Sequence, residues 1–161
     1  MKPTVYLETS VIGYLAMRPS TVLQIAAKQQ ITREWWEHQR SRYELYVSRY
    51  VIEECNAGDP IAALERQHFL AGIPLLDVSD EVSDLAKCLL NETVLPQKAA
   101  IDALHISVSA VNHVQYLVTW NCRHSANLAL RRPIEDICRR LGYRPPILCT
   151  PQDLLEIHDG P

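Results

Sequence analysis

The chain has 161 residues, of which 47% are hydrophobic and 22% charged, a composition typical of one globular domain with a sizeable core. Its net charge of -3 excludes a globally basic nucleic-acid binder, so a polyanionic ligand would have to meet a local basic rim. The five cysteines are scattered, and we find neither a signal peptide nor a membrane-spanning run, so we expect a single cytoplasmic domain over residues 1–161.

The chain is expected to begin with a short apolar strand, Thr4–Leu7, that is buried on both faces. Glu8 follows this strand directly. Thr9 and Ser10 are candidate N-caps for the short helix that comes next. Glu8 is therefore expected at the carboxyl end of a strand, facing the N-terminus of a helix.

A long amphipathic helix is expected over Thr21–Gln39. Its apolar face is formed by Leu23, Ala26, Ala27, Ile31 and Trp35. Trp36 points away from this face, which indicates either an exposed ring or a subunit contact. The pair Trp35-Trp36 fits the core and an interface better than a platform for stacking bases.

The remaining segments alternate between strands and helices. The further expected strands are Tyr43–Val47, Leu75–Val78, Gln115–Thr119 and Ile147–Cys149. Three helices are expected in the middle of the chain: one capped by Ser48 that runs through Cys55, one over Ile61–Leu70 that follows the Asp59-Pro60 cap, and one from Ser79 to near Asn91. The last three are expected over Lys98–Asn112, over Ala126–Leu141, and as a terminal helical turn from Thr150-Pro151 through Glu156. About five short strands separated by helices indicate a three-layer α/β/α domain around a central parallel sheet.

Three carboxylates stand at one strand end and near the starts of two helices. They are Glu8, Glu54 and Asp102. Ligands of open α/β sheets bind at the carboxyl ends of the strands, where these acids can gather. Gathered carboxylates repel one another, so either their pKa values rise or a divalent cation neutralises them. A Mg²⁺ ion held by such hard oxygen ligands would activate water and stabilise charge on a phosphate, which is the chemistry of phosphodiester hydrolysis.

Each of these residues also has a plainer structural explanation. Glu8 can simply interact with the helix dipole, and either Glu54 or its neighbour Glu53 can be a solvated helix charge. His105 lies three residues after Asp102 on the same helix face, where a packed or hydrogen-bonded histidine is commoner than a ligand. The spacing of the acids leaves both explanations open.

Polar residues after the Gln115–Thr119 segment have two readings as well. Asn121 and His124 fit either a site at the sheet edge or caps of the following helix. The pairs Arg131-Arg132 and Arg139-Arg140 fit a solvated helix face better than contacts to a phosphate backbone.

Four blocks of the sequence together carry a resemblance to a known family. They run over residues 5–12, 48–54, 102–110 and 117–121. The first three blocks contain Glu8, Glu54 and Asp102, and the fourth ends at Asn121, where many members of the family have another acid. In this combination the chain resembles a PIN domain, close to the VapC-type toxins of bacterial toxin–antitoxin pairs.

The resemblance implies a metal-dependent ribonuclease in which a water attacks an RNA phosphodiester. Glu8, Glu54, Asp102 and Asn121 would form the catalytic set, with the three acids holding Mg²⁺ or Mn²⁺. It also implies a homodimer and a cognate antitoxin protein that inserts a peptide near the site. The Thr-Trp-Asn-x-x-His-x-x-Asn pattern, which ends with His124 and Asn127, would orient the turn or contact RNA.

Two departures from the family pattern bear on this expectation. Glu8 stands where the family has Asp, and the extra methylene lengthens its reach and adds a rotamer that must be ordered. Asn121 replaces an acid with a neutral amide, so we expect at most one well-bound ion. Both departures favour an alternative, a PIN-fold module without turnover that binds RNA or an antitoxin. A magnesium-dependent phosphatase is disfavoured, because no Asp-x-Asp arrangement follows the first strand.

Overall fold

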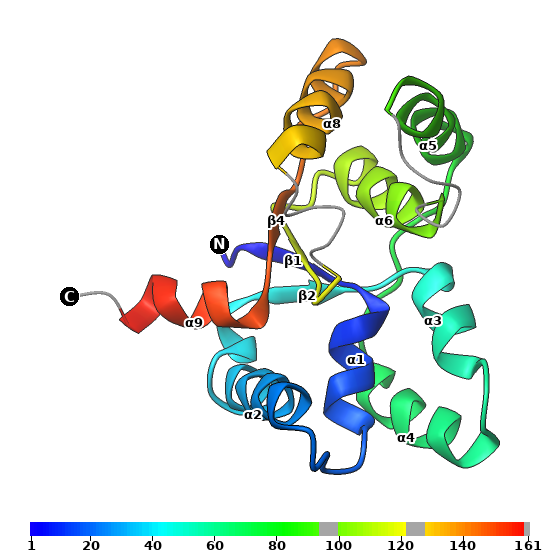
Figure 1. The fold of residues 1–161 in the computed structure, drawn as a ribbon. Helices are drawn as coiled ribbons and strands as arrows, with labels where there is room; N and C mark the ends of the chain where they lie inside the picture. The colour runs from blue at the N-terminus through cyan, green and yellow to red at the C-terminus, as the bar shows by residue number, and fades with distance from the viewer. Residues whose placement is uncertain (94–99, 122–127, 160–161) are drawn as a thin grey trace.

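The computed structural model describes residues 1–93, 100–121 and 128–159, which form helices around a small sheet (Figure 1). The strands are β1 (Thr4–Leu7), β2 (Glu44–Tyr46), β3 (Tyr116–Val118) and β4 (Ile147–Cys149). The helical elements are α1 (Thr9–Ala16), α2 (Leu23–His38), the 3-10 turn η1 (Arg40–Arg42), α3 (Arg49–Asn56), α4 (Pro60–Leu70), α5 (Asp80–Glu92), α6 (Ala100–Val111), α8 (Leu128–Arg140) and α9 (Pro151–Asp159). Within these ranges, no helix combines the length and the apolar character needed to cross a membrane.

The sheet has the strand order β2-β1-β3-β4, and every pairing is parallel. Val5 of the central strand lies opposite Leu45 on one side and Tyr116 on the other. Residues 5–7 of β1 are fully buried, because helices cover both faces of the sheet. Figure 1 shows α5, α6 and α8 on one side of the sheet and α1, α2 and α4 on the other. The predicted three-layer α/β/α architecture with a parallel sheet is confirmed.

The described part of the chain contributes four strands to the sheet, and the prediction of a fifth at Leu75–Val78 is wrong. In this segment the Val47 N–H donates to the Pro74 carbonyl, and the Leu76 N–H donates to the Val47 carbonyl. These two bonds make one isolated parallel bridge next to β2. Pro74 has no N–H with which to extend the ladder, so the segment pairs at a single point.

Helix α2 buries Trp35 as predicted, but the rest of its buried face differs from the predicted one. Its buried residues are Gln29, Thr32, Trp35 and Trp36. Leu23, placed on the predicted apolar face, is 83% exposed. Gln29 can be buried because its side chain donates to the Arg18 carbonyl at 2.8 Å and accepts from the Ser20 N–H at 3.0 Å. Hydrogen-bonded polar residues therefore form part of the buried face, which a purely hydrophobic pattern misses.

Trp36 is a core residue, and the predicted exposed or intersubunit position is wrong. Its side chain is 8% exposed and packs edge-on against Phe69, with ring centroids 5.8 Å apart. The guanidinium of Arg40 lies 4.4 Å from the centre of the Trp36 ring. At the other end of the chain, α9 reaches Asp159, beyond the expected end at Glu156.

Candidate metal centre

Glu8 is placed at the carboxyl edge of the sheet by β1 and β3. Its backbone N–H continues the strand pairing, donating to the Val118 carbonyl at 3.0 Å. Its side chain turns back over the first turn of α1, where Oε2 accepts from the Ser10 N–H at 3.0 Å and from the Ser10 hydroxyl. The Thr119 hydroxyl, just after β3, donates to the same oxygen at 2.8 Å. Glu8 is 4% exposed, so this carboxylate is buried but hydrogen-bonded.

Glu8 is also the N-cap of α1, so the predicted capping by Thr9 or Ser10 is wrong. Its backbone is extended, with φ of -79° and ψ of 157°, and its side chain accepts the Ser10 N–H. A carboxylate at this position interacts favourably with the N-terminus of the helix. Thr9 and Ser10 instead direct their hydroxyls to Glu54 and Glu8.

Glu54 reaches the same edge from α3, the helix that follows β2. Its Oε1 accepts from the Thr9 hydroxyl at 2.7 Å and lies 2.8 Å from His105 Nε2. The side chain is 30% exposed. Burial raises the pKa of this carboxyl, but the hydrogen bonds from His105 and Thr9 lower it more, so the pKa of Glu54 lies below its ordinary value. Glu54 is therefore ionised at neutral pH.

A buried hydrogen-bond chain continues from His105 into the core. The Tyr6 hydroxyl lies 2.6 Å from His105 Nδ1 and 2.7 Å from the Ser48 hydroxyl. Ser48 is the N-cap of α3, as predicted, but its side chain bonds to Tyr6 and makes no capping hydrogen bond. Burial raises the pKa of Tyr6, and the negative charges of Glu8 and Glu54 raise it further. The Tyr6 hydroxyl therefore keeps its proton.

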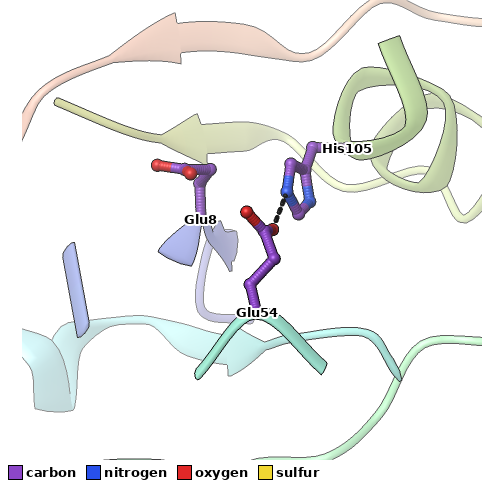
Figure 2. A group of neighbouring side chains, drawn as sticks. All are labelled: Glu8, Glu54 and His105. Carbon is purple, nitrogen blue, oxygen red and sulfur yellow. Dashed lines mark hydrogen bonds and ion pairs between the residues drawn. The ribbon is translucent and has the colours of Figure 1, made fainter. Parts of the chain in front are cut away.

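Glu8, Glu54 and His105 come together as a compact group (Figure 2). One potential ligand atom from each lies within 4.8 Å of the others. A six-coordinate Mg²⁺ ion with bonds of about 2.1 Å needs donor atoms separated by about 3 to 4 Å, so small side-chain rotations would suffice. The two carboxylates provide hard oxygen donors, which suit Mg²⁺ or Mn²⁺. The donor set therefore fits a divalent cation.

The other two predicted site residues lie around this group. Asp102 is half-buried in the first turn of α6, three residues before His105 and on the same helix face, but it is not a member of the compact group. Asn121 is exposed just after β3, and its backbone N–H donates to the Thr119 hydroxyl at 2.9 Å. His124 and Asn127, the other polar residues of that pattern, lie outside the described residues.

Three of the arginines of α8 make ion pairs within the helical layer, and the fourth, Arg132, is exposed. Arg131 and Arg139 both contact Glu135, at 3.4 and 3.7 Å. Arg140 reaches Glu92 of α5. The side chains of these pairs are partly exposed, as on a solvent-facing surface of a helix.

The polar groups that support the acids, above all Tyr6, Ser48 and Thr119, were not predicted as part of the site. One signal was available. A tyrosine in a strand expected to be buried on both faces needs a hydrogen-bond partner for its hydroxyl. Its partner, His105, is far away in the sequence, and nothing in the local pattern links the two.

No protein-family model matches the sequence, and no curated protein matches it significantly. Among solved structures, the chain is similar to VapC20 of Mycobacterium tuberculosis, which is described as a toxin that cleaves the sarcin–ricin loop. The TM-score is 0.58 at 14% sequence identity, and the alignment covers 76% of this chain and 94% of VapC20. The chain therefore has a VapC-type PIN fold. At this identity the likeness establishes the fold and not the activity.

Proposed function

We propose that this protein is a metal-dependent endoribonuclease that hydrolyses RNA phosphodiester bonds and acts as the toxin of a toxin–antitoxin pair. The observation that carries the proposal is the meeting of Glu8 and Glu54 at the carboxyl edge of a PIN-type sheet. VapC20, which is similar in fold, is described as a toxin that cleaves the sarcin–ricin loop, and this supports RNA as the substrate class.

In this proposal Glu8, Glu54 and Asp102 hold Mg²⁺ or Mn²⁺. When bound, the ion activates water and stabilises the charge that develops on the phosphate. Asp102 adds a third carboxylate from the same face of α6 as His105. Asn121, exposed beside Thr119, offers its amide to the RNA or to a water.

We propose that the antitoxin docks beside the site. A groove between α1 and α4 is lined by apolar residues, among them Tyr14, Met17 and Ile61, and it extends to Asn121. Charged residues also line it: Arg18, Asp59, Glu65 and Arg66. Met17 is 47% and Ile61 65% exposed. Exposed apolar side chains next to a polar site are typical of protein docking surfaces. We assign this groove to an apolar segment of the antitoxin, which would lie across the entrance for RNA.

The proposal is tested with purified protein free of antitoxin. We expect it to cleave single-stranded or structured RNA with Mg²⁺ or Mn²⁺, and we expect EDTA to abolish the cleavage. Asp102→Asn should reduce the rate by orders of magnitude, because the ion loses a charged ligand. Asp84→Asn, at an exposed position of α5, is the matched control and should cleave normally.

Two results would change the assignment. An Asp102→Asn protein that cleaves as fast as the parent would place the activity elsewhere. RNA or antitoxin binding without cleavage under either metal would favour the second candidate, a PIN-fold binding module. Glu8 in place of Asp and the neutral Asn121 are the observations that favour this candidate.

A further inference from the structure

Within this site we propose that His105 is a positioning residue for Glu54 and not a metal ligand. Its Nε2–H donates to Glu54 Oε1, so that the other carboxylate oxygen of Glu54 is the one turned to the ion. The inference rests on the proposed function in one respect, because it takes Glu54 as a ligand. The direction of the hydrogen bond itself follows from the distance between the two groups and from their hydrogen-bonding chemistry.

The location of the proton follows from the chemistry of the two groups. Glu54 Oε1 and His105 Nε2 are 2.8 Å apart, a hydrogen-bond distance. An ionised carboxylate can only accept hydrogen bonds, so Nε2 must carry the hydrogen. A ring nitrogen that carries a hydrogen has no lone pair for a metal. His105 therefore belongs to the compact group by distance but does not act as a ligand in this arrangement.

The other side of the ring is completed by two buried hydroxyls. Tyr6 and Ser48 are 0% exposed and His105 is 1% exposed, so these groups must satisfy one another. With a neutral ring, Ser48 donates to the Tyr6 oxygen, and Tyr6 donates to Nδ1. With a charged ring, rotation of both hydroxyls reverses these two bonds. Nε2–H points to Glu54 in either case.

The consequence for Glu54 is a fixed carboxylate. Oε1 receives hydrogen bonds from Thr9 at 2.7 Å and His105 at 2.8 Å, which engage both of its lone pairs. In Figure 2 the other carboxylate oxygen of Glu54 lies on the side of Glu8. We therefore expect Glu54 to bind the ion through one oxygen. Metal sites commonly use such supporting hydrogen bonds to orient their ligands.

The first test reads the hydrogen directly and needs neither metal nor activity. In the metal-free full chain, ¹⁵N NMR of the His105 side chain should show a proton on Nε2. Tyr6→Phe keeps the ring of Tyr6 but removes the hydroxyl, and it should shift the Nδ1 resonance. A His105 ring with a bare Nε2 and a protonated Nδ1 would overturn the proposal.

The second test measures Mn²⁺ binding by electron paramagnetic resonance. We expect no coupling to a directly coordinated nitrogen in the parent protein. His105→Leu should weaken Mn²⁺ binding by about 10- to 100-fold, the range typical of lost supporting partners. His105→Gln, which retains an N–H donor, should restore most of the affinity. Ser107→Ala, on the same helix, is the matched control and should bind Mn²⁺ like the parent.

The outcomes separate the two proposals. A nitrogen coupling that disappears in His105→Leu would make His105 a ligand and overturn the positioning role. Unchanged Mn²⁺ affinity in a folded His105→Leu protein would also overturn it. A parent protein with a protonated Nε2 that binds no Mn²⁺ would count against the proposed metal-dependent function, while the hydrogen-bond assignment would stand.

Discussion

The Thr119 hydroxyl connects the end of β3 to the candidate site, and its removal tests how firmly that edge is held. It donates to Glu8 Oε2 at 2.8 Å and accepts from the Asn121 N–H at 2.9 Å, and the residue is 5% exposed. Thr119→Val keeps the shape and removes both bonds. A hydrogen bond to a charged group contributes about 1.5–3 kcal/mol. Asn121 is exposed, so its N–H can turn to water at little cost.

We therefore expect Thr119→Val to lower the free energy of unfolding by about 2–3 kcal/mol. For a chain of this length, this corresponds to a fall in Tm of about 4 to 12 °C. Urea unfolding followed by circular dichroism in EDTA measures the change without a contribution from bound metal. A free energy of unfolding within about 0.5 kcal/mol of the parent would refute the importance of this bond.

Ser107→Ala is a control for the loss of a buried hydroxyl. Within the described part of the chain, the Ser107 hydroxyl is buried without a hydrogen-bond partner. Its removal should therefore leave the stability unchanged or increase it. Equal destabilisation by both variants would show that the effect of Thr119→Val does not come from its hydrogen bonds.

The pH dependence of stability and the docking groove yield two further predictions. The pKa of Glu54 is lower in the folded protein than its ordinary value. At a pH above the ordinary pKa, the ionised carboxylate therefore stabilises the fold, and this stabilisation is lost as the pH falls through the pKa of the folded protein. In urea unfolding with EDTA, the stability difference between the parent and Glu54→Gln should therefore shrink toward acid pH, and a difference that is constant with pH would contradict this. In the groove, Ile61→Glu should weaken binding of the cognate antitoxin in calorimetry by placing a charge on an apolar contact. Leu64→Glu is the matched control, because Leu64 is also 65% exposed on α4 but is not among the described residues that line the groove. An equal loss of antitoxin affinity in both variants would rule out the assignment of the groove to the antitoxin.

Local sequence signals predicted most of the elements of the fold. The apolar segment Thr4–Leu7 is β1 and Ile147–Cys149 is β4, with the expected bounds, and Asp59 caps α4 with Pro60 in its first turn. These signals work because strand burial and helix capping depend on residues close together in the chain. The Leu75–Val78 segment has the same apolar character and lies beside the edge strand β2, but it pairs only once, because Pro74 lacks the N–H that would continue the ladder.

The candidate site divides in the same way. The position of Glu8 after a strand and the helix that carries Glu54 could be predicted from the sequence, because both follow from local patterns, but Glu54 lies in the last turn of α3 and not near its start as predicted. Their meeting depends on the parallel pairing of β1 with β2 and β3, which brings the ends of separate segments to one edge. The Tyr6–His105 hydrogen bond depends on how α6 packs against the sheet, and residues 99 positions apart carry no local signal of such a contact. Short-range propensities therefore specified which side chains could serve a site, and only long-range packing decided which of them share it.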